Sequence, residues 1–173
     1  MGLFPAGTAL CVCGAAHGAR GTETMPRTRL IDQERYEHSC VIPARITDTN
    51  IGGHVGFTQM VDIIHEARHR FFVALGVREL DLGDGATSII VGDLVVNFLG
   101  EVFAGDDITA ESIIGETGRV GFRVHHRFTV RGKKVLLAET GVVAFNGAAH
   151  RMAPIPRQFF SALERYRSVP CIS

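Results

Sequence analysis

The sequence carries no net charge, since its 18 lysine and arginine residues balance 18 aspartate and glutamate residues. This balance disfavours nucleic acid or an anionic membrane surface as the main partner, because both attract basic proteins. No run of roughly 18 apolar residues occurs, so we expect no transmembrane helix. The four cysteines form no Cys-x-x-Cys pairs, which disfavours a zinc centre and indicates free thiols in a reducing cytoplasm.

Residues 1–24 show neither a helical nor a strand period. They are mostly small and apolar, but they lack the cationic start of a secretory signal, so we expect a disordered extension. The globular pattern begins after this stretch. The remaining length is typical of one domain, and residues 25–173 are predicted to form it.

Hydrophobic spacing in this domain predicts a strand, a long helix, four more strands and a short terminal helix. Between His54 and Leu75 apolar residues recur three, four or seven positions apart, as on a helix, and Gly76 is a typical residue to end it. The turn-forming run at 48–53 separates this helix from a strand at 40–46. The later strands are predicted at 87–98, 107–114, 120–130 and 135–145, and the last helix at 157–167.

A long helix that is apolar on much of its circumference needs to be covered. Four long strands joined by short links supply one curved antiparallel sheet to cover it. The sequence therefore predicts an α+β fold in which a curved antiparallel sheet wraps a long central helix. Such a sheet has edge strands and one open side, so we expect a homodimer or a dimer of dimers.

Three motifs in this order resemble the hotdog superfamily, and within it acyl-CoA thioesterases similar to 4-hydroxybenzoyl-CoA thioesterase. Residues 48–55 read Asp-Thr-Asn-Ile-Gly-Gly-His-Val, where the family typically has Asp-Thr-Asp-x-x-Gly-His-Val-Asn-Asn. The predicted helix then contains Glu-Ala-Arg at 66–68, and residues 98–106 resemble the family link aromatic-x-x-Pro-x-x-x-Gly-Asp. The resemblance implies a hotdog fold and an enzyme that hydrolyses an acyl-CoA to a free acid and CoA, without a cofactor or a metal.

The start of the helix is the expected place for the thioester. Its unpaired N–H groups and the positive end of its dipole can polarise a carbonyl. Gly56 leaves room for the acyl group, although glycines at this point also serve simply to make the turn. The expected substrate-binding residues are Gly53, Val55, Gly56 and Phe57.

Two departures from the family pattern shape the expected chemistry: Asn50 stands where many members have a catalytic Asp, and Gly56-Phe57 replaces Asn-Asn. Asn50 cannot ionise, so we expect it to donate to the carbonyl or to hold a water. His54, expected to open the helix, is predicted to be neutral and to orient a water or the ligand. Each of the two also has a structural interpretation, Asn50 as a turn residue and His54 as a ring bonded to the preceding loop.

The base is then expected on the helix. Asp62 and Glu66 lie four residues apart and therefore share one face. Glu66 matches the family motif and is preferred, on the expectation that the sheet buries it. The alternative is that each carboxylate only pairs with a neighbouring histidine or arginine.

Two other functions stay open on this fold. An enoyl-thioester hydratase or dehydratase is disfavoured because three residues separate Asn50 from His54 and no Pro lies between them. A non-catalytic acyl-CoA binding module is compatible with the replacement of Asp by Asn. His125 and His126 point to opposite faces of a strand and so cannot share a metal. Arg119, Arg123 and Arg127 form a basic row that suits either CoA phosphates or solubility.

Overall fold

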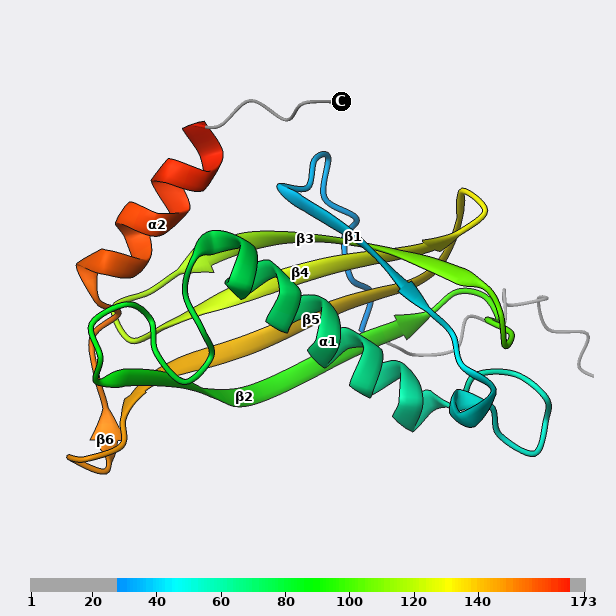
Figure 1. The fold of residues 1–173 in the computed structure, drawn as a ribbon, viewed down its shortest axis with the longest axis horizontal. Coiled ribbons are helices and arrows are strands. Elements are labelled where there is room, and N and C mark those ends of the chain that lie inside the picture. Colours follow the sequence, from blue (N-terminus) through cyan, green and yellow to red (C-terminus); the bar gives the residue numbers. More distant parts are fainter. Residues whose placement is uncertain (1–27, 169–173) are drawn as a thin grey trace, which may run out of the picture.

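A computed structural model describes residues 28–168 (Figure 1). The extension predicted at residues 1–24, the domain boundary at residue 25 and three of the four cysteines lie outside this range. Within residues 28–168, no helix is long and apolar enough to cross a membrane.

Six strands form one antiparallel sheet in the order β1-β3-β4-β5-β2, with β6 paired to β5. The strands are β1 (His38–Pro43), β2 (Thr87–Phe98), β3 (Asp107–Thr117), β4 (Gly121–Val130), β5 (Lys133–Asn146) and β6 (Arg151–Met152). Helix α1 (Phe57–Leu75) runs along one face of the curved sheet, and α2 (Arg157–Ser168) lies at one end of it (Figure 1). A short 3-10 turn, η1 (Ile46–Asp48), follows β1. This arrangement confirms the predicted α+β hotdog fold, with a central helix wrapped by an antiparallel sheet.

Helix α1 begins at Phe57, so the prediction that His54 opens the helix was wrong. The N-cap is Gly56, and the residues before it belong to a turn with its own bonds. The Asn50 amide donates to the His54 carbonyl (2.9 Å), and the Val55 amide donates to the distant carbonyl of Val102 (2.8 Å). The apolar spacing could not reveal this, because the bond from Val55 to Val102 joins segments far apart in the chain. At the other end Gly76 adopts φ 80° and ends the helix as predicted.

Two hydrophobic clusters fill the space between α1 and the sheet. One contains Met60 and Ile64 near the helix start, and the other contains Phe71, Phe72 and Phe159 near its end. Buried side chains of this size contribute roughly 1.5–3 kcal/mol each, so both clusters are needed to offset the entropy lost on folding.

A row of buried polar side chains separates the two clusters. We call Ser112, His126 and Thr140 of the sheet, together with Arg68 of α1, the polar row. Ser112 and His126 are paired in register on β3 and β4, and Ser112 Oγ lies 2.8 Å from His126 Nδ1. Arg68 Nε donates to Oε1 of Glu79 (2.7 Å), so its buried charge is compensated.

The opposite face of the sheet is charged. Arg123 Nε donates to Glu139 (2.5 Å) and its Nη1 donates to Asp93 (2.7 Å), while Arg127 Nε donates to Glu111 (2.6 Å). These carboxylates neutralise much of the basic row that the sequence offered to CoA phosphates. The basic row was interpreted either as a site for CoA phosphates or as a solvated face. The internal ion pairs fit the solvated face better.

Candidate functional site

The start of α1 carries free backbone donors. No side chain among residues 28–168 caps this end, and the first bond within the helix runs from the Met60 amide to the Gly56 carbonyl (2.9 Å). The amides of Phe57, Thr58 and Gln59 therefore have no partner inside the helix. They lie at the positive end of the helix dipole, which suits an oxygen that gains negative charge.

Asn50 and His54 form a bonded pair in the turn before the helix. Asn50 Oδ1 accepts a hydrogen bond from the Gly52 amide (2.7 Å), which leaves its Nδ2 facing His54 Nε2 at 3.2 Å. Since Nδ2 can only donate, Nε2 must be the unprotonated nitrogen, and the neutral ring carries its proton on Nδ1. The Asn50 amide thus fixes both the position and the tautomer of His54.

Asp48 holds the loop to the helix. Its buried carboxylate accepts from Arg45 Nη2 (3.0 Å), Arg45 Nε (3.2 Å) and the Arg45 amide (2.8 Å), and its carbonyl accepts from the Gly56 amide (3.0 Å). The hydrogen bonds from the Arg45 side chain hold the pKa of Asp48 below its usual range. An ionised, fully bonded carboxylate serves the loop geometry, so Asp48 is a structural residue of the motif.

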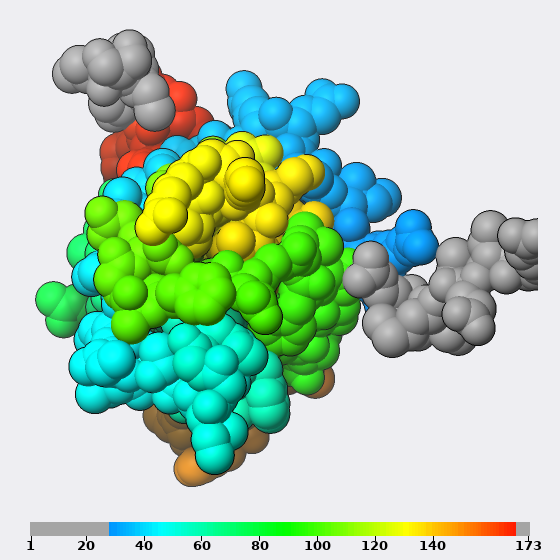
Figure 2. Space-filling view, turned by 90° about the vertical axis from the view of Figure 1, so that its right-hand side faces the viewer, coloured from blue at the N-terminus to red at the C-terminus, as the bar shows by residue number. Residues whose placement is uncertain are grey.

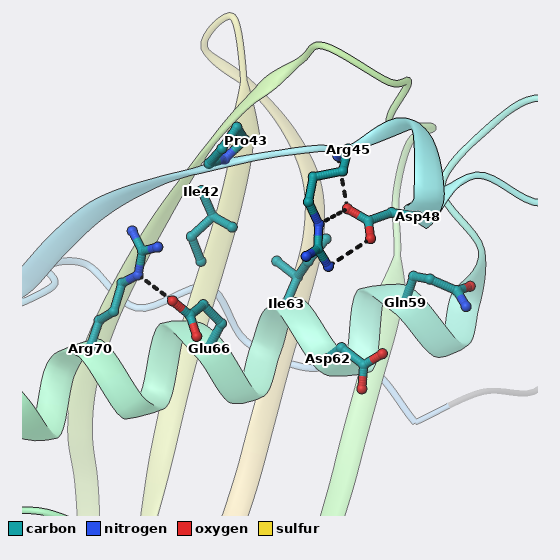
Figure 3. A pocket seen from close by; sticks show the side chains of 9 residues that line it. All are labelled: Ile42, Pro43, Arg45, Asp48, Gln59, Asp62, Ile63, Glu66 and Arg70. Atoms are coloured by element: carbon teal, nitrogen blue, oxygen red, sulfur yellow. Dashed lines mark hydrogen bonds and ion pairs between the residues drawn. The ribbon is translucent and has the colours of Figure 1, made fainter.

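Two cavities flank the start of α1. The carboxylate cavity, of about 350 Å³, lies between α1, β1 and η1 (Figure 3). Its lining residues are Ile42, Pro43, Arg45, Asp48, Gln59, Asp62, Ile63, Glu66 and Arg70. The histidine cavity, of about 230 Å³, lies between α1 and the β2–β3 link. Its lining residues are His54, Val55, Phe57, Met60, Phe98, Gly100, Glu101, Val102, Val135 and Leu136.

The predicted catalytic residues divide between these cavities. His54, with Asn50 bonded to it, lines the histidine cavity, whereas Asp62 and Glu66 line the carboxylate cavity. Of the predicted substrate-binding residues, Val55 and Phe57 line the histidine cavity. The structure therefore does not bring all four predicted catalytic side chains into one cavity of a single chain.

The remaining predicted binding residues are two glycines with different positions. Gly56 is buried at the N-cap, where a Cβ atom would collide with Oε1 of the flexible Gln59 side chain. Gly53 is exposed and adopts φ 79°, a conformation that side-chain-bearing residues rarely take. The turn thus requires glycine at 53, while Gly56 keeps the helix start open.

The helix carboxylates differ in their bonding. Glu66 Oε1 accepts a hydrogen bond from Arg70 Nε at 2.7 Å, and Figure 3 shows the two side chains together. The Glu66 side chain is 44% exposed. The expectation that the sheet buries Glu66 was therefore wrong, because Glu66 lies at the side of α1 that faces β1 and solvent. The side chain of Asp62 is exposed and has no hydrogen bond or ion pair with any other described residue.

Glu101 is a candidate that sequence reasoning missed. It is the only carboxylate that lines the histidine cavity, and it has no bonded partner among residues 28–168. The bond from the Val55 amide to the Val102 carbonyl (2.8 Å) brings Glu101 beside the turn that holds His54. No local spacing marks this residue, because the contact joins segments far apart in the chain.

A family model described as "Thioesterase-like superfamily" matches residues 44–163. A 1,4-dihydroxy-2-naphthoyl-CoA hydrolase of Acaryochloris marina (strain MBIC 11017) is 28% identical over 128 residues, which cover 70% of this chain and 92% of that protein. A protein of the same name from Synechococcus elongatus is 26% identical over 125 residues, covering 71% of this chain and 90% of the relative.

Solved structures share the fold at lower identity. A 1,4-dihydroxy-2-naphthoyl-CoA thioesterase from Synechocystis superposes with a TM-score of 0.65 at 17% identity, over 72% of this chain and 93% of the other. A thioesterase from Thermus thermophilus, complexed with coenzyme A and Zn, gives a TM-score of 0.67 at 22% identity, over 80% of this chain and 99% of the other. The chain therefore belongs to the thioesterase-like superfamily of hotdog proteins and is a thioester hydrolase, as the motifs between Asp48 and Glu66 predicted.

Proposed function

We propose that this protein hydrolyses an acyl-CoA, with the thioester carbonyl bound by the free amides at the start of α1. The observation that carries this proposal is the uncapped helix start, next to the Asn50–His54 pair and between two cavities. Donors that are fixed before the reaction stabilise a developing oxyanion without reorganising.

Water is the nucleophile in this proposal, because Asn50 cannot form an acyl-enzyme. A carboxylate takes a proton from the water while the water oxygen adds to the carbonyl carbon of the thioester. The oxyanion that forms is stabilised by the Phe57–Gln59 amides. When the carbon–sulfur bond breaks, the free acid remains and the CoA thiolate takes up the proton. His54, held by Asn50, orients the water or the thioester.

The base is proposed among the helix carboxylates. Asp62 lies in the second turn of α1 and has no competing partner among the described residues, whereas Glu66 is bonded to Arg70. Asp62 is therefore favoured over Glu66, which reverses the preference drawn from the family motif. Glu101 is the alternative if the water approaches from the histidine cavity.

An aromatic acyl group is the proposed substrate class. The histidine cavity is small, at about 230 Å³, and is lined mainly by apolar side chains that include Phe57, Met60 and Phe98. Such a cavity suits a ring better than a long acyl chain. The names of the relatives, 1,4-dihydroxy-2-naphthoyl-CoA hydrolases, support the same class.

A homodimer joined through β2 is also proposed. Strand β2 is an edge of the sheet, and Ile90 and Val91 on it are each 46% exposed. Phe57 and Val61 on the same side of α1 are 71% and 38% exposed. An apolar edge of this kind favours pairing with a second copy. Because Phe57 also lines the histidine cavity, the partner would lie beside the site. A dimer of dimers and a cytoplasmic location stay expectations from the sequence.

Assays on the whole chain test the function. Aromatic, short, medium and long acyl-CoAs are incubated with the protein while free thiol is followed, and an enoyl-CoA is followed by absorbance. We expect thiol release, fastest with the aromatic acyl-CoA. Binding without thiol release across the panel would favour the acyl-CoA binding module, and hydration of the enoyl-CoA would change the reaction class.

A further inference from the structure

A groove of about 500 Å³ lies at the same end of the molecule as the start of α1. It is formed between the β2–β3 link at residues 99–106 and the β4–β5 turn at residues 130–135. Figure 2 shows the yellow β4–β5 turn beside this green link, with the cyan segment that precedes α1 on the other side of the link.

Cationic side chains form one wall of the groove. Arg131, Lys133 and Lys134 line it against two carboxylates, Glu101 and Asp106. Arg131 Nη2 is 2.8 Å from Asp106 Oδ1 and its side chain is 85% exposed, so its other donors face solvent. The side chain of Lys133 has no hydrogen bond or ion pair with any residue from 28 to 168. The groove thus offers one free ammonium group and further donors to an anion.

The hairpin that carries these cations is closely defined. Arg131 has φ 50° and Gly132 has φ 75°, as a type I′ hairpin turn needs. The pairing of Val130 with Lys133 fixes the turn to the sheet. Lys134 is held from outside the groove, since its Nζ is 2.7 Å from Asp32 Oδ2, and its side chain is 48% exposed. The cations are therefore carried by a tight two-residue hairpin turn.

The other wall of the groove is apolar. Phe103 is 49% exposed and Leu99 is 44% exposed, and both line the groove. An exposed aromatic ring beside free cations matches a ligand that has a flat base next to phosphate groups. The groove also continues into the histidine cavity, because Gly100, Glu101 and Val135 line both.

We propose that this groove binds the nucleotide end of coenzyme A. Lys133 and Arg131 bind its phosphate groups, Phe103 contacts the adenine, and the pantetheine arm passes over Gly100 to the start of α1. This proposal rests on the proposed function and adds to it, because it assigns the direction in which the substrate lies. It also selects CoA as the carrier of the acyl group over a carrier protein, whose prosthetic arm has no adenine.

The test compares one acyl group on two thiols, CoA and N-acetylcysteamine, which lacks the nucleotide. For Lys133→Glu we expect KM for the acyl-CoA to rise about tenfold, with kcat unchanged and with no change for the N-acetylcysteamine thioester. Arg165→Glu changes the charge equally on α2, at the other end of the fold, and should leave all constants as they are. Phe103→Ala should raise the same KM without a change of charge.

Binding of free CoA gives a second readout that needs no activity. Calorimetry should show that the wild-type protein binds CoA more tightly than pantetheine and that Lys133→Glu removes the difference. Equal binding of CoA and pantetheine by the wild type, or an unchanged KM in Lys133→Glu, would overturn the groove assignment while thiol release still supports the thioesterase. Absence of thiol release would instead count against the proposed function, and CoA binding would then decide on the groove alone.

Discussion

Asn50 Nδ2 lies 3.2 Å from His54 Nε2, and the Asn50 side-chain oxygen is already engaged by the Gly52 amide. This bond gives the asparagine a role that an ionised aspartate could not fill in the same way. A carboxylate would accept a hydrogen bond from a protonated Nε2, whereas the amide donates a hydrogen bond to an unprotonated Nε2, so the two residues select opposite tautomers of the ring. The replacement of Asp by Asn is thus a change in how His54 is protonated.

Asn50→Ala tests this role. Loss of the amide frees the His54 ring and its tautomer, so we expect kcat to fall about 10- to 100-fold with little change in KM. Steady-state kinetics with the preferred acyl-CoA measure both constants. Thr49→Ala is the matched control, because its hydroxyl bonds only to the Ile46 carbonyl (2.7 Å) in the same loop. A kcat equal to that of the wild type in Asn50→Ala would leave Asn50 as a turn residue only.

Three variants show which carboxylate acts as the base: Asp62→Asn, Glu66→Gln and Glu101→Gln. We expect Asp62→Asn to lower kcat roughly 10²- to 10⁴-fold, which is the range that general-base catalysis contributes. Glu66→Gln should have a smaller effect, because its carboxylate is bonded to Arg70. A pH–rate profile that loses its acidic limb in one variant identifies the base. If that variant is Glu101→Gln, the water approaches from the histidine cavity and the helix assignment is wrong.

Val91→Glu tests the proposed dimer. Val91 lies on the free edge strand β2, near Asp93, so a second carboxylate would place like charges close together where two copies pair. We expect sedimentation to change from dimer to monomer, together with a loss of thiol release. Val73→Glu, at a 54% exposed position near the end of α1, should change neither property. A wild-type chain that sediments as a monomer would refute the dimer outright.

Stability should fall in mild acid because of His126. Burial lowers the pKa of this ring from its ordinary 6.5 to about 3. Between these two values the unfolded chain binds a proton that the folded chain does not, so stability is fully present above pH 6.5 and is lost as pH falls toward 3. From pH 6.5 to 5 the loss should be roughly 2 kcal/mol.

Urea midpoints at pH 7, 6 and 5 measure this loss. His126→Gln retains a side-chain acceptor for Ser112 but cannot titrate, so its midpoint should change less over this range. Burial also lowers the pKa of His38, which adds in the same direction, and a His38→Gln variant separates the two contributions. The carboxylates with lowered pKa, such as Glu79, titrate below this window. If the urea midpoint falls equally with pH in the wild type and in His126→Gln, the assignment to His126 is contradicted.

Local spacing predicted most of the fold. The strand at 87–98 was located to the residue, and the helix end at Gly76 was correct, because a run rich in β-branched residues and a left-handed glycine depend on neighbouring residues alone. The helix start was placed too early. Residues 54–56 belong to a turn in which the Val55 amide bonds to the Val102 carbonyl, a contact between distant parts of the chain that local spacing does not show.

The site was only partly predictable for the same reason. The pairing of Asn50 with His54 spans four residues, and the motif located both. The bonding of Arg68 to Glu79, the exposure of Glu66 and the position of Glu101 beside His54 depend on how loops and strands meet. Composition carries no record of such contacts, so a motif can name a segment without saying which of its carboxylates faces the substrate.

The polar row across the core has a consequence for how this protein can change. It interrupts apolar contact between the cluster beneath the helix start and the cluster around Phe159. A change of side-chain volume in one cluster is then not passed directly to the other. A substitution at the end that holds Asn50, His54 and both cavities should therefore leave the packing around Phe159 unchanged. The shape of the site and the packing around α2 can thus vary separately, although both clusters contribute to stability.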